Sequence, residues 1–311
     1  RQPQMTRASF VGQDLDEGTL EYPSEDELNI PSDNFDDYTL VLYGQKGRGK
    51  TTLSAAFPKT LTLMLEPFRK GLSIRQVSVT KYTAEQIRDG KPDIWRRVIN
   101  TTQQWIDDPT VERISFDSID LFYSTCQESV CARNKLNVPG DAGRASADIW
   151  IQIREEFAAY MNTLKDSGMR ITMLSHVKDR EESDLDGGKM KFSQPSCSPA
   201  CLTYIKQAAD IVLQVGRYND KRAAMVRDPG NMAFVSNGAQ GKFLQPDGKP
   251  LNIFELPDIL SDKPQVELYN TLVAAFNNKL WDMDTPEDQR GPAKPTAPKG
   301  PPTKKPPLTK R

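Results

Sequence analysis

Residues Gly44 to Thr51 read G-Q-K-G-R-G-K-T, the residue types and spacing of a loop that binds the phosphates of a nucleotide. A triphosphate needs several backbone N–H groups directed at one centre, and glycine lets the backbone curl this tightly without a Cβ clash. Gly44, Gly47 and Gly49 meet that need. The Lys50 ammonium can reach the β and γ phosphates, and the Thr51 hydroxyl can bind Mg²⁺.

The neighbouring sequence supports this reading. The apolar run 40–43 suits a strand before the loop, and residues 52–57 suit a helix after it. A glycine-rich surface turn is the alternative, and this strand-to-helix setting disfavours it. We therefore expect a nucleotide and Mg²⁺ as cofactors, the nucleotide being ATP if the resemblance described below holds, bound by the loop and the residue after it: Gly44, Gln45, Lys46, Gly47, Arg48, Gly49, Lys50, Thr51 and Thr52.

Two further apolar runs end in acids. Residues 61–65 suit a buried parallel strand that ends at Glu66, and residues 113–117 suit another that ends at Asp117. Nucleotide hydrolysis needs one carboxylate to orient the attacking water and one to support Mg²⁺. We expect Glu66 and Asp117 to share these two roles, with Thr51 at the metal; the position of Glu66 beside the loop suits orientation of the water, but the residues alone leave the assignment of the two roles open.

Two basic residues are candidates for sensing or completing the site. His176 is the single histidine of the chain and ends the apolar run 170–175, at the strand edge where the γ-phosphate should lie. A structural role explains a lone histidine equally well. Arg227 precedes a turn and could act on the nucleotide of a neighbouring subunit, although a plain surface arginine is the simpler interpretation.

The elements that must position these residues alternate between strands and helices. Helices are expected over residues 93–107, 119–134 and 146–165 and after Pro264, and further strands over 209–216 and 222–227. This order predicts an α/β fold with a mostly parallel central sheet flanked by helices. The ordered domain is expected to span residues 38–282.

The segment from Val177 to about Pro199 is long and polar, and we expect a loop without regular structure. Lys189, Lys191 and Phe192 offer charge and a stacking face for single-stranded DNA. Acidic residues in its first half oppose that reading, and a solvated loop remains the alternative.

Both ends of the chain differ in charge from the middle. Residues 1–37 hold ten Asp or Glu against two Arg, and residues 290–311 hold seven Lys or Arg, seven prolines and no acid. We expect a flexible acidic head and, over residues 283–311, a disordered basic tail that is a linker, a partner-binding segment or a nucleic-acid contact. No apolar stretch or signal pattern points to a membrane, so a cytoplasmic location is expected.

Four cysteines lie at positions 126, 131, 197 and 201. Their spacings of five and four differ from the C-x-x-C of a zinc knuckle. We expect buried free thiols, with a zinc site as the alternative.

The phosphate loop, the strand ending in Glu66, I-S-F-D-S and the strand ending in S-H resemble a RecA-type ATPase core. The stretch 122–130, Trp150 with residues 153–157, and the stretch 171–178 are similar to a phage group within it, the Sak-type single-strand annealing proteins. The resemblance covers roughly residues 38–228. It implies a RecA-like P-loop NTPase that binds single-stranded DNA and promotes annealing or strand exchange in phage recombination, in the host cytoplasm.

The resemblance also assigns roles. It implies that Glu66 is the catalytic base, that Asp117 supports Mg²⁺, that His176 senses the γ-phosphate and that Arg227 acts in trans within a ring or filament. The DNA-binding loop would be 178–198, with contacts from Lys178, Arg180, Lys189, Lys191 and Phe192. A single-strand-binding protein is a possible partner. A hexameric helicase or loader motor, and a nucleotide-gated adaptor with negligible turnover, remain alternatives.

Overall fold

The computed structural model describes residues 32–65, 73–80, 93–183, 189–228, 233–258 and 264–282. The chain divides into two compact units, Arg1–Ser32 and Asp33–Arg311, and the second contains every described element. Glu66 and the basic tail 283–311 lie outside the described residues, as does almost all of the acidic head.

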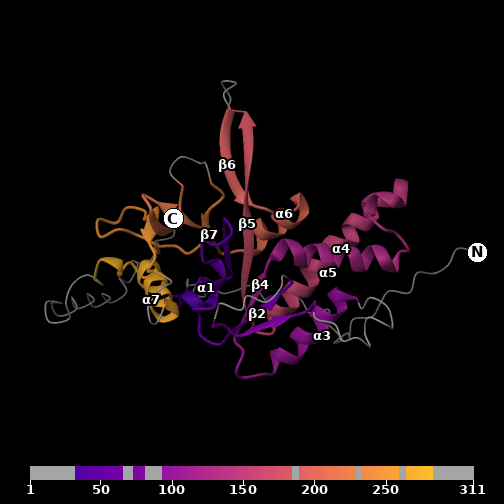
Figure 1. Ribbon diagram of the computed structural model, residues 1–311, viewed down its shortest axis with the longest axis horizontal. Helices are drawn as coiled ribbons and strands as arrows, with labels where there is room; N and C mark the ends of the chain where they lie inside the picture. The colour runs from indigo at the N-terminus through magenta and orange to yellow at the C-terminus, as the bar shows by residue number, and fades with distance from the viewer. Residues whose placement is uncertain are drawn as a thin grey trace, which may run out of the picture. The chain divides into compact units, whose positions relative to one another are not determined.

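A sheet of ten strands forms the centre of the described unit (Figure 1). Its main order is β10-β8-β7-β1-β5-β4-β2-β3, with β6 paired to β5 and β9 to β7. The strands are β1 (Leu40–Gly44), β2 (Thr60–Met64), β3 (Gln76–Ser78), β4 (Arg113–Asp117), β5 (Arg170–Ser183), β6 (Lys189–Pro195), β7 (Ile211–Tyr218), β8 (Lys221–Met225), β9 (Ser236–Asn237) and β10 (Ile253–Glu255). The six strands from β7 to β3 are parallel, while β8 and β10 run antiparallel at one edge.

Helices cover both faces of this sheet, as the sequence predicts. They are α1 (Lys50–Ser54), α3 (Ile94–Ile106), α4 (Ile119–Arg133), α5 (Ser146–Asp166), α6 (Pro199–Ala208) and α7 (Pro264–Phe276), with short 3₁₀ turns at Phe35–Asp37, Pro139–Ala145 and Leu280–Asp282. Because side chains alternate along a strand, β1 feeds two separate cores. Val41 and Tyr43 pack with α3, α4 and α5, whereas Leu40 and Leu42 pack with α1 and α7.

Local sequence explains where several elements begin. The Asp93 carboxylate accepts a hydrogen bond from the Arg96 amide and starts α3, and Ser198 caps α6 ahead of Pro199. Asn219 and Asp220 both have positive φ, which is the geometry of the two-residue turn that returns β7 into β8.

The polar segment after His176 corrects one expectation. It is not an irregular loop, because Val177–Ser183 continues β5 and pairs with β6 in an antiparallel hairpin. The hairpin extends away from the main sheet in Figure 1. Its strands carry polar side chains on both faces, so the apolar alternation that reveals a half-buried strand is missing. We call this hairpin the arm.

The first residues of the described unit correct a second boundary. Residues 33–37 were expected in the flexible acidic segment, yet Phe35 is fully buried in the core shared with α1 and α7. The buried Arg113 guanidinium donates to the Asp36 carbonyl at 2.5 Å, and Tyr269 donates to the Asp36 carboxylate at 2.9 Å. These contacts fix the segment to the start of β4 and to α7.

Candidate nucleotide-binding site

The sheet order brings three predicted positions to one edge. Gly44, the last residue of β1, pairs with His176 on β5, and Asp117 ends β4 on the far side of β5. Carboxyl ends of parallel strands share one edge of a sheet, which is where α/β proteins bind ligands. The loop, the acid and the histidine therefore lie together although more than 130 residues separate Gly44 from His176.

Glycine is required by geometry at three points of the loop. Gly47 and Gly49 have φ of 79° and 81°, in the left-handed region that disfavours other residues. At Gly44 the reason is space, because a Cβ there would lie 2.0 Å from the carbonyl oxygen of Val215 on β7. The loop thus has the glycine-dependent curl that the sequence predicts, and the structure adds its close approach to β7.

Lys50 is buried, and its side chain folds back across the loop. Its ammonium donates to the carbonyl oxygens of Gly44 at 2.9 Å and Gln45 at 3.0 Å. The charge is therefore held within the curve of the loop, where an anionic phosphate would meet it. Gln45, Lys46 and Gly47 form the exposed side of the loop.

Thr51 and Asp117 form the predicted metal pair. Both are buried, and the Thr51 hydroxyl donates to the Asp117 carboxylate at 2.7 Å. One helical turn later, Ser54 and Ser115 bond through their hydroxyls at 2.5 Å and hold α1 against β4. Hydroxyl and carboxylate oxygens suit Mg²⁺, which keeps several waters and takes few protein ligands. These two residues fit the expected ion.

Of the other two predicted strand-end residues, the structure describes His176 but not Glu66. The Leu65 amide donates to the Asp117 carbonyl at 3.2 Å, so the chain leaves β2 beside Asp117. Glu66 itself is outside the described residues. His176 is half-buried, and its carbonyl accepts a hydrogen bond from the Ser196 amide at 2.7 Å.

Arg227 does not lie at the loop of its own chain. It follows β8, which runs antiparallel to β7 and so leads away from the loop edge. Its guanidinium donates to the Phe243 carbonyl at 3.2 Å. The proposed action on a neighbouring subunit stays a prediction.

The sequence reasoning missed Arg222, which reaches the loop instead. Its guanidinium donates to the carbonyls of Arg48 and Gly49 at 3.2 and 3.0 Å. Burial lowers the pKa of Arg222, and the charge of Asp258 opposes that shift. The available signal was the N-D turn before Lys221, which predicts a hairpin that would return the chain beside β7.

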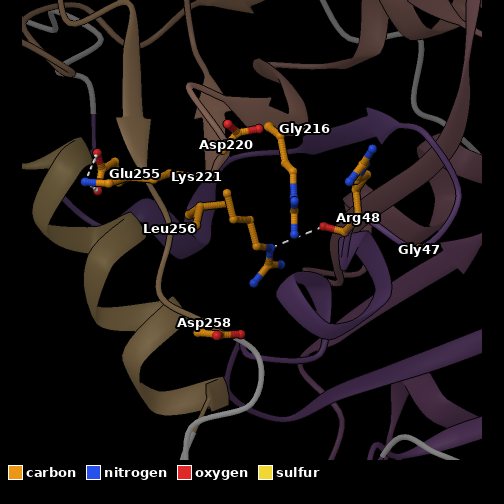
Figure 2. Close-up of a pocket in the computed structure, with 10 residues that line it drawn as sticks. Gly47, Arg48, Gly216, Asp220, Lys221, Glu255, Leu256 and Asp258 are labelled. Atoms are coloured by element: carbon orange, nitrogen blue, oxygen red, sulfur yellow. Dashed lines mark hydrogen bonds and ion pairs between the residues drawn. The ribbon is translucent and has the colours of Figure 1, made fainter.

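A cavity of about 340 Å³ adjoins the outer side of the loop (Figure 2). Gly47 and Arg48 line it from the loop, and the rest of its lining comes from the β7–β8 hairpin and the segment after it: Gly216, Arg217, Asp220, Lys221, Arg222, Glu255, Leu256 and Asp258. Figure 2 shows the Lys221–Glu255 ion pair across the cavity from Arg48. The cavity thus combines cationic and acidic side chains with loop backbone.

The predicted DNA-contact residues all fall on the arm. Lys178, Arg180 and Lys191 are exposed, and Phe192 is half-buried. Lys189 pairs with Ser183 in the ladder, and its side chain is outside the described part of the structure. The arm therefore brings the candidate residues together in two paired strands.

The four cysteines are free thiols, and Cys126, Cys131 and Cys201 are buried. Within the described ranges, no group of three or more His, Cys, Asp or Glu side chains could hold a metal ion. Among the same residues, no helix has both the length and the apolar character needed to span a membrane.

Comparison with solved structures gives distant similarities. The flagellar accessory protein FlaH from Methanocaldococcus jannaschii is 13% identical with a TM-score of 0.36, over 76% of this chain and 89% of that one. The KaiC-like protein PH0186 from Pyrococcus horikoshii OT3 is 14% identical with a TM-score of 0.33, over 71% and 90%. No curated protein matches the chain.

A family model gives the decisive comparison. The model described as AAA domain matches residues 36–234, which include the phosphate loop, Asp117, His176 and the arm. The match covers well over half of the chain. Together with the geometry of the loop, it shows that the chain belongs to the AAA domain family and is a P-loop NTPase.

Proposed function

We propose that the protein binds and hydrolyses Mg-ATP and couples its nucleotide state to the binding of single-stranded DNA during annealing or strand exchange. The observation that carries the nucleotide part is the contact between Thr51 and Asp117 beside the buried Lys50 ammonium. The resemblance to phage annealing proteins supplies the DNA part.

Each residue of the site then has a distinct task in hydrolysis. Lys50 would leave the Gly44 and Gln45 carbonyls and bind the β and γ phosphates. Thr51 and Asp117 would hold Mg²⁺, which neutralises charge on the phosphates. Glu66 would orient the attacking water, and His176 would report the γ-phosphate to the arm along β5.

The cavity in Figure 2 is the place we propose for the part of the nucleotide beyond the phosphates. It adjoins Gly47 and Arg48, and its volume of about 340 Å³ lies within the usual range for ligand sites. Its cationic side chains can donate hydrogen bonds, and its carboxylates can accept them, to and from the hydroxyl groups and ring nitrogens of a nucleotide.

The register of the arm supports a DNA-binding face. Opposite residues in an antiparallel pair point to the same side, so Arg180 and Phe192 share one face with Lys178. Asp179 and Glu181 fall on the other face, where Ser193 donates to Asp179 at 2.7 Å and Glu181 lies opposite Lys191. Of the acids that oppose DNA binding in the sequence, Glu181 thus lies on the side away from Arg180 and Phe192, whereas Glu182 follows Arg180 at the next ladder position of the same side.

We call Lys178, Arg180 and Phe192 the cationic face of the arm. Two cationic side chains and one aromatic ring suit single-stranded DNA, because the cations can neutralise its phosphates and the ring can stack on a base. Lys178 and Arg180 lie on β5, the strand that carries His176, and Phe192 lies opposite Arg180 on β6, so we propose β5 as the route from the nucleotide to DNA.

Anisotropy of a labelled oligothymidylate, titrated with protein and Mg-ATP over several salt concentrations, tests the DNA proposal. Phe192→Ala should weaken binding by about 1–3 kcal/mol, the usual value for one stacked base. Lys178→Ala and Arg180→Ala should each flatten the slope of log affinity against log salt by about 0.7. The matched control is Lys191→Ala on the acidic face, and an equal loss from it would contradict the assignment.

The alternatives differ in turnover and in strand separation. Stimulation of ATP hydrolysis by single-stranded DNA supports the proposal or a helicase-type motor, and unwinding of duplex DNA by the pure protein would favour the motor. Nucleotide binding without turnover, with or without DNA, would instead favour a nucleotide-gated adaptor.

A further inference from the structure

Arg222 joins three segments that are distant in sequence. It lies on β8 and donates through Nε to the Arg48 carbonyl at 3.2 Å and through one terminal nitrogen to the Gly49 carbonyl at 3.0 Å. Its other terminal nitrogen donates to the Pro257 carbonyl at 3.2 Å. A planar guanidinium can meet several acceptors in fixed directions, which a lysine ammonium cannot do.

The two loop carbonyls have a consequence for phosphate binding. In a trans peptide the C=O and the following N–H point in opposite directions. Fixing the Arg48 carbonyl therefore directs the Gly49 N–H away from Arg222, and fixing the Gly49 carbonyl does the same for the Lys50 N–H. These two amides belong to the loop that is expected to surround the phosphates.

The packing of Arg222 also explains part of the sequence of the loop. A Cβ at position 49 would lie 2.4 Å from a terminal nitrogen of Arg222 and 2.8 Å from its central carbon. Gly49 is thus required both by its φ of 81° and by the guanidinium against it. The Arg222 backbone is held as well, because its carbonyl accepts from the Leu256 amide at 2.8 Å.

We propose that Arg222 is a positioning residue that holds two peptide units of the phosphate loop with their N–H groups turned toward the nucleotide. The inference rests on the proposed binding of ATP. Arg222 acts through the loop backbone, so its loss should weaken the binding of ATP equally in the ground state and in the transition state. Such a change raises KM and leaves kcat unchanged.

The test is titration of the full chain with a fluorescent mant-ATP and Mg²⁺, together with steady-state ATPase kinetics. Arg222→Ala should raise Kd and KM about 10-fold, equal to about 1.4 kcal/mol, with kcat within about twofold of the wild type. Arg222→Lys keeps the charge without the planar fork and should remain close to the alanine variant. Arg133→Ala removes an exposed, ion-paired arginine between α4 and α5 and should bind as the wild type does.

Added guanidinium sharpens the test. Millimolar guanidinium should lower Kd for Arg222→Ala and leave the wild type unchanged, an effect that a merely misfolded variant would not show. Circular dichroism checks folding, and Arg222→Gln replaces the alanine variant if that variant does not fold.

Two results would overturn the inference. One is an unchanged Kd for mant-ATP in Arg222→Ala when the wild type binds normally. The other is a wild-type Kd in Arg222→Lys, which would show that positive charge alone explains the effect of Arg222. Failure of the wild type itself to bind mant-ATP would overturn the proposed function, so the two failures can be told apart.

Discussion

The Thr51 hydroxyl donates to the Asp117 carboxylate at 2.7 Å and thereby joins the helix after the phosphate loop to the end of β4. The bond passes the end of β5, because β5 separates β1 from β4 in the sheet. Both partners are buried, so neither can exchange this bond for water without a change in the site. The two residues proposed to hold Mg²⁺ are consequently in contact within the folded chain.

Removing either partner should abolish the response to Mg²⁺. Thr51→Val and Asp117→Asn should each lower turnover by roughly 100-fold, because the ion stabilises charge on the phosphates by several kcal/mol. Titration of ATPase activity with MgCl₂ checks this. Thr62→Val is the matched control, since its buried hydroxyl makes no hydrogen bond within the described residues. A Mg²⁺ response that survives in both site variants would contradict the assignment.

Lys50→Ala should remove nucleotide binding more severely than any other change in the loop. The variant loses a charge-assisted contact to the phosphates, for which we expect Kd to rise by at least about 100-fold. Isothermal calorimetry with ATP and Mg²⁺ measures it. Lys249→Ala, which alters an exposed lysine paired with Asp247, should retain the wild-type affinity. The same Kd for ATP in Lys50→Ala and the wild type would show that Lys50 does not bind the nucleotide.

Arg113→Met should destabilise the fold by about 3–5 kcal/mol, as expected when one partner of a buried ion pair is lost. The Arg113 guanidinium lies 3.8 Å from the Asp36 carboxylate, donates to the Asp36 carbonyl and the Thr172 hydroxyl, and lies 4.5 Å from the centre of the Phe57 ring. Burial lowers its pKa to about 10. Urea unfolding followed by circular dichroism gives the change in free energy.

The comparison variant is Arg133→Met, which breaks an exposed pair with Glu156. It should cost no more than about 1 kcal/mol. Equal losses in the two variants would show that Arg113 does not fasten residues 33–37 to the sheet.

Stability should fall above pH 10. Burial raises the pKa of Tyr123 to about 12, and burial with the Asp36 hydrogen bond raises the pKa of Tyr269 to about 12. In the unfolded chain these phenols ionise near pH 10, so between about pH 10 and 12 the folded state holds more protons and its stability declines as pH rises. Below pH 10 the contribution is fully present.

Urea titrations at pH 8, 10 and 11, with tyrosinate absorbance at 295 nm, follow this decline. Tyr269→Phe has one fewer phenol to ionise and should lose less stability over the same range. A flat profile in the wild type would contradict the expected linkage.

The sequence predicts the phosphate loop and the strand ending at Asp117 because both signals are local. The loop follows from glycine geometry, and the strand from a short apolar run before an acid. The sheet itself was predictable for the same reason, since its central strands are buried on both faces and read as apolar segments. Contacts across the sheet require the strand order, which no local pattern contains.

Arg222 and the arm show what local patterns cannot supply. The N-D turn can indicate that β8 folds back beside β7, but the contact between Arg222 and Gly49 also depends on β7 lying next to β1, and no local pattern contains that strand order. The arm has few apolar side chains, and its ladder is held by backbone bonds that any sequence can make. Residues 33–37 were assigned to the flexible acidic segment because their composition is mostly acidic, and the one apolar residue among them, Phe35, was too weak a signal of burial.

The unbroken course of β5 has a mechanical consequence. Thirteen rises separate its ends, Arg170 and Ser183, so at about 3.3 Å each the strand is roughly 43 Å long, and His176 lies near its midpoint. One half pairs with β1 and β4, and among the described strands the other half pairs with β6. A small tilt of β5 at His176, beside Gly44, would therefore move the end of the strand at Ser183 through a larger distance, as in a lever.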